Sequence, residues 1–561
     1  MKRFVSSILT RSQKKKQKWI SASELKHVVN DNHLLDWLNQ HGIKKGYKQD
    51  INKQNTFLMN MGHIFEDKIV KLLQDRLNIK FPQIGKSHLD AINETKFYQT
   101  VELLKANVPV IYQGVLHNTS NNTYGMPDLI IRSDIINDLT DIPSLTEEEI
   151  YMNDRPYYII VDIKMMTLNL SVDNIHILNN PKIKSYKSQM AIYNEALNNI
   201  LGVRSPFAFL LGRRWKSREQ SDDTSFNRLG RIDFDGRDNE ILEITNNGII
   251  QLKEIKSEDA ENWEIGEKDY FYPNMKSNKD WDYPWVSAKK EIAKDIDEIT
   301  EVYYCGVKNR NMALEVGVNK WSDPRCTAEL MGIGGNKIAP LVNKFLDVNR
   351  SGIANLEFNR NSIWRKKSYR ECYIDFEFIN GIEIEDFNNL PTAKTNNMIY
   401  MIGIYYTDDG TNYKFEQLTA RDLTLPSEFE LIDKFNSKIM EINPERLFHW
   451  GNAEPMNYRK SCVRHNVNII NLNWIDFCKI MKDELIIIPS MFGFGLKEVA
   501  KAMFDSGLIL NYWETELNGS SAMLSTRNAY GTKPHLLKRI EDYNREDCVI
   551  MFDVIDYFSS I

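Results

Sequence analysis

The first 215 residues alternate between segments with helical spacing of apolar residues and short, continuous apolar runs. A helix is predicted at 183–200, and a shorter one begins after an N-cap at Ser21 or Ser23. The apolar runs predict strands at 108–116, 126–132, 157–163 and 207–211. Strands that alternate with helices predict an α/β domain over residues 20–215. A further helix is predicted at 56–78, where the apolar residues fall on one side: Phe57, Met61, Phe65, Ile69, Leu72 and Leu73.

The pattern becomes less regular after residue 215. Charged residues with few long apolar faces predict strand and hairpin pieces up to about residue 300, and residues 298–348 are predicted to be helical. The glycine-rich segment 332–337 does not fit a GxxxxGK[ST] phosphate loop, so we expect a turn between helices there. Strands at 372–378 and 398–406, followed by helices, predict a second α/β domain over 370–561. In this scheme 1–19 is a basic tail and 216–369 a mixed, partly helical connector.

Acidic residues stand at two strands and a helix of the first domain. Asp162 and Lys164 share one face of their strand, because successive side chains of a strand point to opposite faces. Asp128 begins a neighbouring strand, and Glu66 on the 56–78 helix can supply a further oxygen ligand. Mg²⁺ and Mn²⁺ prefer such oxygen ligands, and Lys164 could then hold the nucleophile or the developing charge. Two alternatives remain: His63 could replace Glu66 as a ligand, and Asp162 with Lys164 could be a plain surface ion pair.

The order of these residues along the chain resembles a known nuclease family. Gln189 and Tyr193 are four residues apart on the 183–200 helix and therefore share a face. The full set resembles the PD-(D/E)XK nucleases of the RecB-like and phage-exonuclease-like branch, and that resemblance implies a restriction-endonuclease-like fold. Many RecB-like members carry His where this chain has Glu66, and several carry a cysteine-ligated cluster that is missing here. The matching motifs are GxxxE (Gly62, Glu66), GxPD (Gly125, Pro127, Asp128), DxK (Asp162, Lys164) and QxxxY (Gln189, Tyr193).

A second acidic set belongs to the C-terminal domain. Asp375 and Glu377 share one strand face, as the carboxylate pair of a two-metal exonuclease does. Tyr543 and Asp547 are four residues apart on a predicted helix, so both face the same side. Glu454 follows an apolar strand and a turn, and it is the candidate further ligand. Charged faces of this kind also occur without catalysis, so a purely structural role for this set stays open.

This second set resembles the DEDD exonuclease branch of the RNase H-like fold, in the variant that is fused to RecB-like nucleases. The resemblance implies that Asp375 and Glu377 form the first motif, that Glu454 stands in the second, and that Asp547 with Tyr543 forms the third. Segments 475–477 and 494–497 also fit this variant, with Asp476 as an accessory acid, and 298–335 resembles a degenerate helix-hairpin-helix element. Most proofreading-type exonucleases have Asp where this chain has Glu454.

Composition and charge narrow the class of protein. With 42% hydrophobic and 26% charged residues, and no run of 18 apolar residues, the chain is expected to lack a membrane-spanning helix. Six cysteines without a CxxC pair argue against a zinc finger, an iron–sulfur cluster or a disulfide framework, and they suit a reducing intracellular compartment, cytoplasmic or nuclear. The net charge of −6 decides little, because metal-binding carboxylates offset basic grooves. The basic N-terminus could be a nucleic-acid-binding arm, a nuclear or organelle signal, or a solvated tail.

We therefore expect a Mg²⁺- or Mn²⁺-dependent nuclease with two active sites, with DNA favoured as substrate by the resemblance. Two alternatives are that only the N-terminal domain is catalytic while the C-terminal domain binds nucleic acid, and that the chain is a binding scaffold with two decayed sites. No helicase motif is present, so unwinding would require a helicase or replication partner. The expected role is repair, recombination or end processing, and a viral source is one option. Five basic and aromatic residues are expected either to contact single-stranded nucleic acid or to form a solvated linker anchored by one Trp: Arg213, Arg214, Trp215, Lys216 and Arg218.

Overall fold

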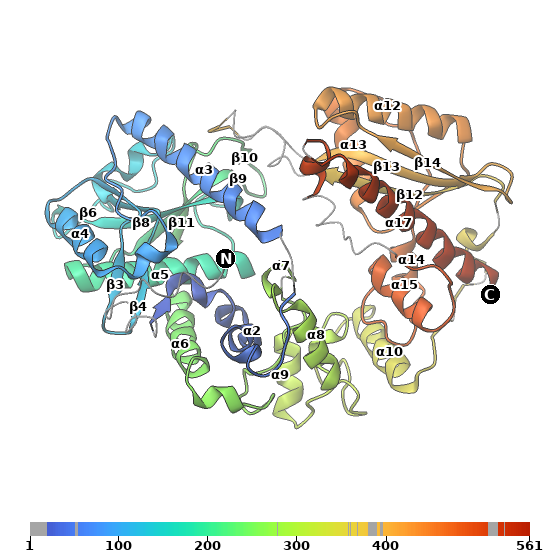
Figure 1. Ribbon diagram of the computed structural model, residues 1–561, viewed down its shortest axis with the longest axis horizontal. Coiled ribbons are helices and arrows are strands. Elements are labelled where there is room, and N and C mark those ends of the chain that lie inside the picture. Colours follow the sequence, from blue (N-terminus) through green and yellow to red (C-terminus); the bar gives the residue numbers. More distant parts are fainter. Residues whose placement is uncertain are drawn as a thin grey trace. The chain divides into compact units, whose positions relative to one another are not determined.

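The computed structural model describes residues 19–50, 54–277, 279–356, 358–359, 361–366, 368–379, 390–392, 397–513, 525–531 and 533–561. The chain divides into two compact units (Figure 1). The first comprises Met1–Ile292 and Phe387–Lys394, and the second comprises Ala293–Asp386 and Thr395–Ile561. The predictions for the basic tail up to residue 18 and for the side chain of Phe57 lie outside the described residues.

The first unit is built on a six-stranded mixed sheet with the order β10-β9-β8-β5-β2, in which β11 also pairs with β9. β8 and β9 are parallel, whereas β2, β5, β10 and β11 join by antiparallel pairing. A smaller sheet has the order β1-β4-β3, and β6 pairs with β7. The strands are β1 Ile20–Ser21, β2 Val110–Tyr112, β3 Leu116–Asn118, β4 Thr123–Gly125, β5 Leu129–Arg132, β6 Tyr151–Met152, β7 Arg155–Pro156, β8 Tyr158–Asn169, β9 Phe207–Lys216, β10 Ser221–Asp222 and β11 Gly230–Asp233.

Helices cover both faces of this sheet (Figure 1). Side chains such as Ile160 pack towards α5, and their neighbours such as Val161 pack towards α3, as the alternation of a strand requires. The predicted helices 56–78 and 183–200 correspond to α3 and α5. The helical elements are η1 Ala22–Lys26, η2 Val28–Asn30, α2 His33–Trp37, η3 Leu38–Gly42, α3 Gln54–Leu77, η4 His88–Ile92, α4 Glu94–Lys105, η5 Ser133–Asp138, α5 Pro181–Leu201, α6 Glu240–Ile255, η6 Asp259–Asn262, α7 Lys279–Asp282 and α8 Val286–Asp295.

Three boundaries of this unit differ from those expected. The predicted strand 108–116 is two strands in different sheets, because Gln113 adopts a positive φ of 50° and turns the chain between β2 and β3. The helix after Ser21 is a short 3₁₀ helix, η1, with Ser21 as its N-cap. The compact unit also continues past residue 215, where the first domain was expected to end, because β11 pairs with β9 and α6 packs against α5.

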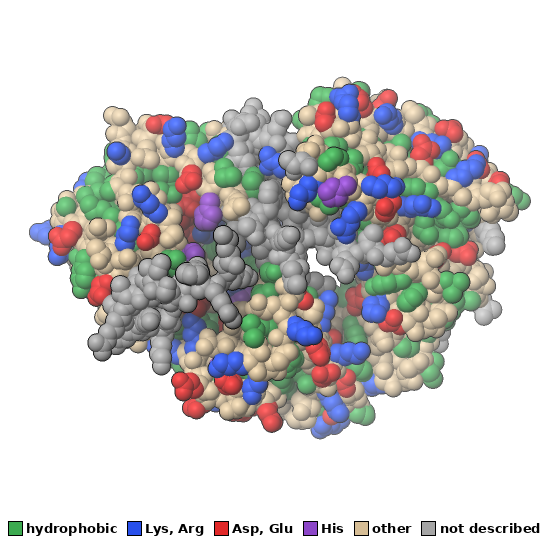
Figure 2. All heavy atoms as spheres, in the orientation of Figure 1, with side chains coloured by type: hydrophobic (Ala, Val, Ile, Leu, Met, Phe, Trp, Pro, Cys, Tyr) green, Lys and Arg blue, Asp and Glu red, His purple; other side chains and the backbone are tan. Residues whose placement is uncertain are grey.

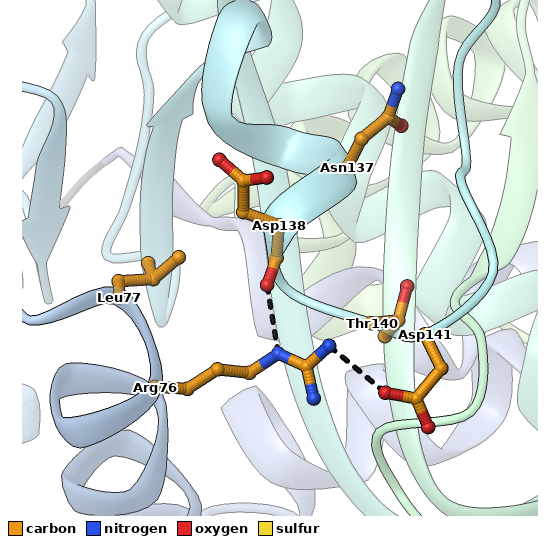
Figure 3. Close-up of a pocket in the computed structure, with 6 residues that line it drawn as sticks. All are labelled: Arg76, Leu77, Asn137, Asp138, Thr140 and Asp141. Carbon is orange, nitrogen blue, oxygen red and sulfur yellow. Dashed lines mark hydrogen bonds and ion pairs between the residues drawn. The ribbon is translucent and has the colours of Figure 1, made fainter.

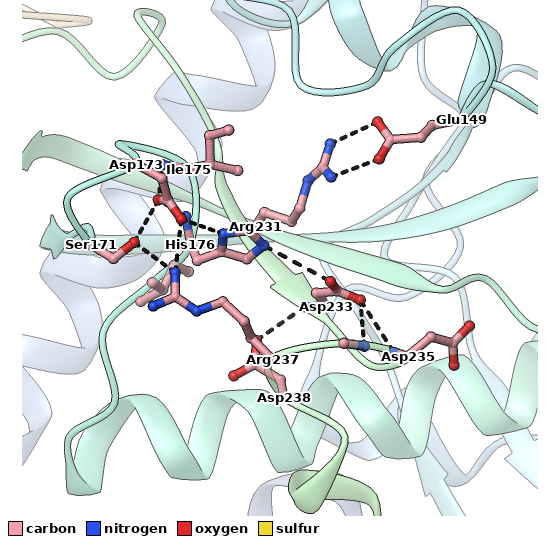
Figure 4. A network of polar contacts seen from close by, with 12 residues as sticks. Glu149, Ser171, Asp173, Ile175, His176, Arg231, Asp233, Asp235, Arg237 and Asp238 are labelled. Atoms are coloured by element: carbon pink, nitrogen blue, oxygen red, sulfur yellow. Dashed lines mark hydrogen bonds and ion pairs between the residues drawn. The ribbon is translucent and has the colours of Figure 1, made fainter.

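A network of charged side chains ties the loop after β8 to β11 and to the start of α6 (Figure 4). Asp173 accepts hydrogen bonds from the backbone N–H of Ile175 at 2.8 Å and from Arg237 at 2.8 Å, and it pairs with Nδ1 of His176 at 2.8 Å. Arg231 on β11 binds Glu149 with two contacts of 2.8 and 2.9 Å. These contacts hold the loop that leads into α5.

The second unit contains a five-stranded sheet with the order β14-β13-β12-β15-β16. β12 pairs antiparallel with β13 and parallel with β15, and α17 lies along β12 and β13 (Figure 1). The segment 332–337 turns ahead of α10, as expected. The elements are η7 Ile299–Glu301, α9 Val307–Glu315, α10 Ile338–Ser351, η8 Ile363–Arg365, β12 Glu371–Ile379, β13 Met398–Thr407, β14 Tyr413–Thr419, α12 Leu425–Ile442, β15 Arg446–His449, α13 Ala453–His465, β16 Trp474–Asp476, α14 Phe477–Asp483, α15 Leu496–Asp505 and α17 His535–Ser560.

Candidate active sites

One cluster of carboxylates forms where α17 crosses β12. Asp375 and Glu377 lie on the same face of β12, and Asp547 comes from α17. Gly403 is the partner of Asp375 on β13, and a Cβ atom there would lie 2.5 Å from Oδ1 of Asn544 on α17. The glycine therefore permits the close approach of α17 that brings Asp547 to the strand.

The three carboxylates are close enough to share a cation. Ligand oxygens of Asp375, Glu377 and Asp547 all lie within 4.8 Å of one another, and Glu377 and Asp547 are only 6% and 7% exposed. Neighbouring donors orient two of the three. The amide of Asn544 donates to Oδ2 of Asp375 at 2.7 Å, and the indole N–H of Trp513 donates to Oδ1 of Asp547 at 2.6 Å. The cluster is thus a fixed, oxygen-only ligand set, which suits a hard divalent cation.

The electrostatics of this cluster favour the binding of a positive charge. Burial, together with repulsion from Asp547, raises the pKa of both Asp375 and Glu377 well above the ordinary value of a carboxyl group. Burial also raises the pKa of Asp547 to about 6, although attraction to Lys497 opposes the shift. Lys497 is in the first turn of α15, and its ammonium lies 4.4 Å from the centre of the Tyr543 ring. A divalent cation would relieve the repulsion that these pKa shifts report.

Glu454 and Tyr543 lie at the same cluster. The charge of Glu454, in the first turn of α13, contributes to the raised pKa of Asp375, after burial and the two other acids. Its Oε2 atom is buried and has no hydrogen-bond partner among the residues that the structure describes. Tyr543 is 5% exposed and hydrogen-bonded to Asp547 one turn later on α17. The structure therefore brings together all five residues that the sequence predicted for this site. Asp476, expected as an accessory acid, instead caps α14 by accepting from the backbone N–H of Lys479 at 3.1 Å.

Sequence reasoning missed three residues of this site: Lys497, Trp513 and Asn544. Asn544 could have been found, because it stands three residues before Asp547 and so shares its helix face. Lys497 belongs to segment 494–497, which resembles the exonuclease variant, but the sequence predicted no function for this lysine. Trp513 follows an irregular segment, and no sequence periodicity links it to Asp547.

The acidic residues of the first unit meet on the α5 side of its sheet. Lys164 forms an ion pair with Asp162, and its Nζ lies 4.0 Å from Oδ2 of Asp128. That Oδ2 atom accepts the backbone N–H of Ile163 at 2.7 Å, which fixes the carboxylate against β8. Asp162 and Lys164 lie on β8, Asp128 immediately precedes β5, which pairs with β8, and Asp162 is 1% exposed. The plain surface ion pair considered for Asp162 and Lys164 is therefore wrong.

Glu66 stands beside this group. Its carboxylate accepts from the amide of Gln113 at 2.9 Å, and burial raises its pKa, with a contribution from the charge of Asp162. Burial would lower the pKa of Lys164, but attraction to Asp162 and Asp128 outweighs it and raises that pKa. Among the described residues, Glu66, Asp128 and Asp162 do not form a three-ligand set within 4.8 Å, in contrast to the β12 cluster. His63, the alternative ligand, has a 69% exposed side chain with Nδ1 3.9 Å from Glu66.

Gln189 and Tyr193 complete the same region from α5. The amide of Gln189 donates to the Tyr193 hydroxyl at 2.8 Å, and Tyr193 is 3% exposed. Burial raises the pKa of Tyr193, with a further contribution from the charge of Asp162. A Cβ atom at Gly125 would lie 2.2 Å from the Tyr193 ring, so the glycine leaves room for it. The residues of all four motifs therefore lie around one place in the first unit.

The basic and aromatic segment 213–218 is not a stacking surface. Trp215 is 4% exposed, its indole N–H donates to Asn227 at 2.9 Å, and the guanidinium of Arg228 lies 4.5 Å above its ring. Arg213 is also buried. The expectation that Trp215 stacks on a nucleobase is wrong, and its observed role is that of an anchor at the end of β9.

Other surface features point to no ligand. An open pocket lies between α3 and the segment after η5, where Arg76 donates to the carbonyl of Asp138 at 2.8 Å and pairs with Asp141 at 2.9 Å (Figure 3). The guanidinium of Arg76, which carries the positive charge of this pocket, is therefore already paired within the protein. On the face shown in Figure 2, basic and acidic side chains of the described residues are interspersed. No helix within the described residues is both long and apolar enough to cross a membrane.

Comparison with known proteins bears on the second unit. No curated protein matches the chain. Residues 386–559 match the family model of the RNase_H superfamily. The match includes Glu454, Tyr543 and Asp547, and it begins after Asp375 and Glu377, which β12 contributes to the same sheet. The C-terminal domain of this chain is therefore RNase H-like, which points to a nuclease-type enzyme acting on nucleic acid.

Proposed function

We propose that this protein is a divalent-metal-dependent nuclease that hydrolyses phosphodiester bonds in DNA, with one active site in each unit. The observation that carries the proposal is the convergence of Asp375, Glu377 and Asp547 within 4.8 Å in an RNase H-like domain. Mg²⁺ or Mn²⁺ is the cofactor that fits this oxygen-only set. Repair, recombination or end processing is the role we favour, with a separate helicase as partner.

In the C-terminal site the residues have distinct tasks. A bound cation would activate water and neutralise charge on the scissile phosphate. Asp375, Glu377 and Asp547 hold that cation, while Asn544 and Trp513 keep two of the carboxylates in one orientation. The Tyr543 hydroxyl, one helical turn from Asp547, can hold the attacking water. Lys497 balances the negative charge of the acids and can contact the phosphate.

In the first unit, the meeting of four motifs supports a PD-(D/E)XK nuclease of the RecB-like type. Glu66, Asp128 and Asp162 would hold the cation, and Lys164 would stabilise charge on the phosphate. Lys164 pairs with Asp162 in the structure, so a cation would compete with its ammonium for that carboxylate. Gln189 and Tyr193 support the carboxylates from α5.

The test measures cleavage of labelled single- and double-stranded DNA by the wild type and by Asp162→Asn, Asp375→Asn and the double variant, each with Mg²⁺ and with Mn²⁺. We expect each single variant to lose one class of product and the double variant to lose all cleavage. If Asp375→Asn leaves every product unchanged, only the first unit is catalytic. If the wild type binds DNA but cleaves none with either ion, the binding-scaffold function replaces the nuclease.

A further inference from the structure

Buried polar atoms without partners gather beside the C-terminal carboxylate cluster. Nδ1 of His449 and Oε2 of Glu454 are buried and lack a hydrogen-bond partner among the described residues, and so do both amide atoms of Asn457. The three residues are 2%, 6% and 3% exposed. Most buried polar groups in proteins are hydrogen-bonded, so neighbouring exceptions require a reason.

His449 and Glu454 are aimed at one another. His449 ends β15, Glu454 is in the first turn of α13, and Nδ1 of the first lies 3.6 Å from Oε2 of the second. This separation is about half an ångström longer than a hydrogen bond, so a small rotation of either side chain closes it. Because neither atom has a hydrogen-bond partner among the described residues, that rotation breaks no hydrogen bond of either atom.

We infer that His449 is a positioning residue: its Nδ1–H donates to Oε2 of Glu454 and leaves Oε1 free to serve the cation held by the cluster on β12. The inference rests on the proposed metal-dependent function. A glutamate has one more rotatable bond than an aspartate, and an imidazole that fixes one oxygen removes that freedom.

The chemistry of metal sites supports this role. Carboxylate ligands are usually held by hydrogen bonds from outer residues, and loss of such a partner typically lowers metal affinity about ten- to a hundredfold. A direct bond from His449 to the cation is less well supported. Neither His449 nor Glu454 belongs to the group of described residues with ligand atoms within 4.8 Å of one another. The charge of Glu454, however, contributes to the raised pKa of both Asp375 and Glu377, so we assign the contact with the cation to Glu454.

The test follows Mn²⁺ binding to the full chain by the loss of the free-ion EPR signal, without substrate. An Asp162→Asn background isolates the C-terminal site. We expect His449→Leu to weaken Mn²⁺ binding about ten- to a hundredfold. His449→Asn should restore most of the affinity, because its amide can donate from nearly the same place as Nδ1. Far-UV circular dichroism of the cation-free variants checks that each one folds.

A matched buried histidine of the first unit controls for packing. His41 is 3% exposed, its Nδ1 also has no hydrogen-bond partner within the described part of the chain, and its Nε2 bonds the carbonyl of Ile255 at 2.8 Å. We expect His41→Leu to leave Mn²⁺ affinity unchanged. The inference is overturned if His449→Leu binds Mn²⁺ like its parent, or if His449→Asn binds as weakly as His449→Leu. If the parent binds no cation and Asp375→Asn changes nothing, the proposed function fails as well.

Discussion

At the scale of single residues, the buried acids make stability depend on both pH and cation. Burial and mutual repulsion raise the pKa of Asp375 and Glu377, and the pKa of Asp547 is about 6. A carboxyl whose pKa is higher in the folded chain adds stability below its unfolded pKa and loses it as the pH rises through its folded pKa. Without cations, raising the pH from about 4 to above 6 should therefore lower the free energy of unfolding of the wild type. The decrease should be larger than that of Asp547→Asn, by an amount on the order of 2 kcal/mol.

Urea unfolding at pH 5 and pH 7.5, with EDTA or with Mg²⁺, measures this effect. Mg²⁺ should restore stability to the wild type at pH 7.5 and have a smaller effect at pH 5, because protons compete for the same oxygens. Asp547→Asn should respond less to either change. Parallel loss of stability in the two proteins between pH 5 and pH 7.5 would show that Asp547 on α17 is not its source.

Single residues also show which parts of a site a sequence can reveal. Strand alternation was sufficient to pair Asp375 with Glu377, and helical spacing paired Tyr543 with Asp547, because both rules act over four residues or fewer. The donors Trp513 and His449 reach the cluster through tertiary packing. Their distances in sequence from their partners Asp547 and Glu454 follow neither period.

At the scale of elements, the fit of α17 against the sheet depends on one glycine. In Gly403→Ala, the added methyl group would lie 2.5 Å from Oδ1 of Asn544 and 2.9 Å from Sγ of Cys548. Because the side chains of Asn544 and Cys548 must shift, and Asn544 orients Asp375, we expect about 1–3 kcal/mol lower stability and weaker Mn²⁺ binding. Gly334→Ala, in the same unit and with nothing within 4 Å, is the control and should preserve both. Equal behaviour of the two variants in thermal unfolding and Mn²⁺ titration would contradict the close approach.

The main elements were predictable where their patterns are strong. The expectation of strand and hairpin pieces up to about residue 300 was wrong for most of that segment, because α6, α7 and α8 are helices in a strongly charged stretch. Other errors arose where one residue interrupts a pattern. The apolar run 108–116 looked continuous, yet the positive φ of Gln113 divides it between two sheets. Local periodicity contains no information on which sheet a strand joins, so the pairing of β11 with β9 was also missed. The long helices α3 and α5 matched within a few residues.

At the scale of the whole molecule, two units with separate cores and separate acidic clusters should respond separately to cations. Calorimetry of the full chain should resolve two transitions, because each unit has its own hydrophobic core. A ligand at a hundred times its Kd stabilises the unit that binds it by about 2.7 kcal/mol. Lys164 already neutralises Asp162, so Mn²⁺ should shift the first unit's transition less than that of the second. Asp162→Asn should abolish the smaller shift, and Asp375→Asn the larger one. Two equal shifts, or one shift that both variants remove, would mean that the clusters do not bind cations independently.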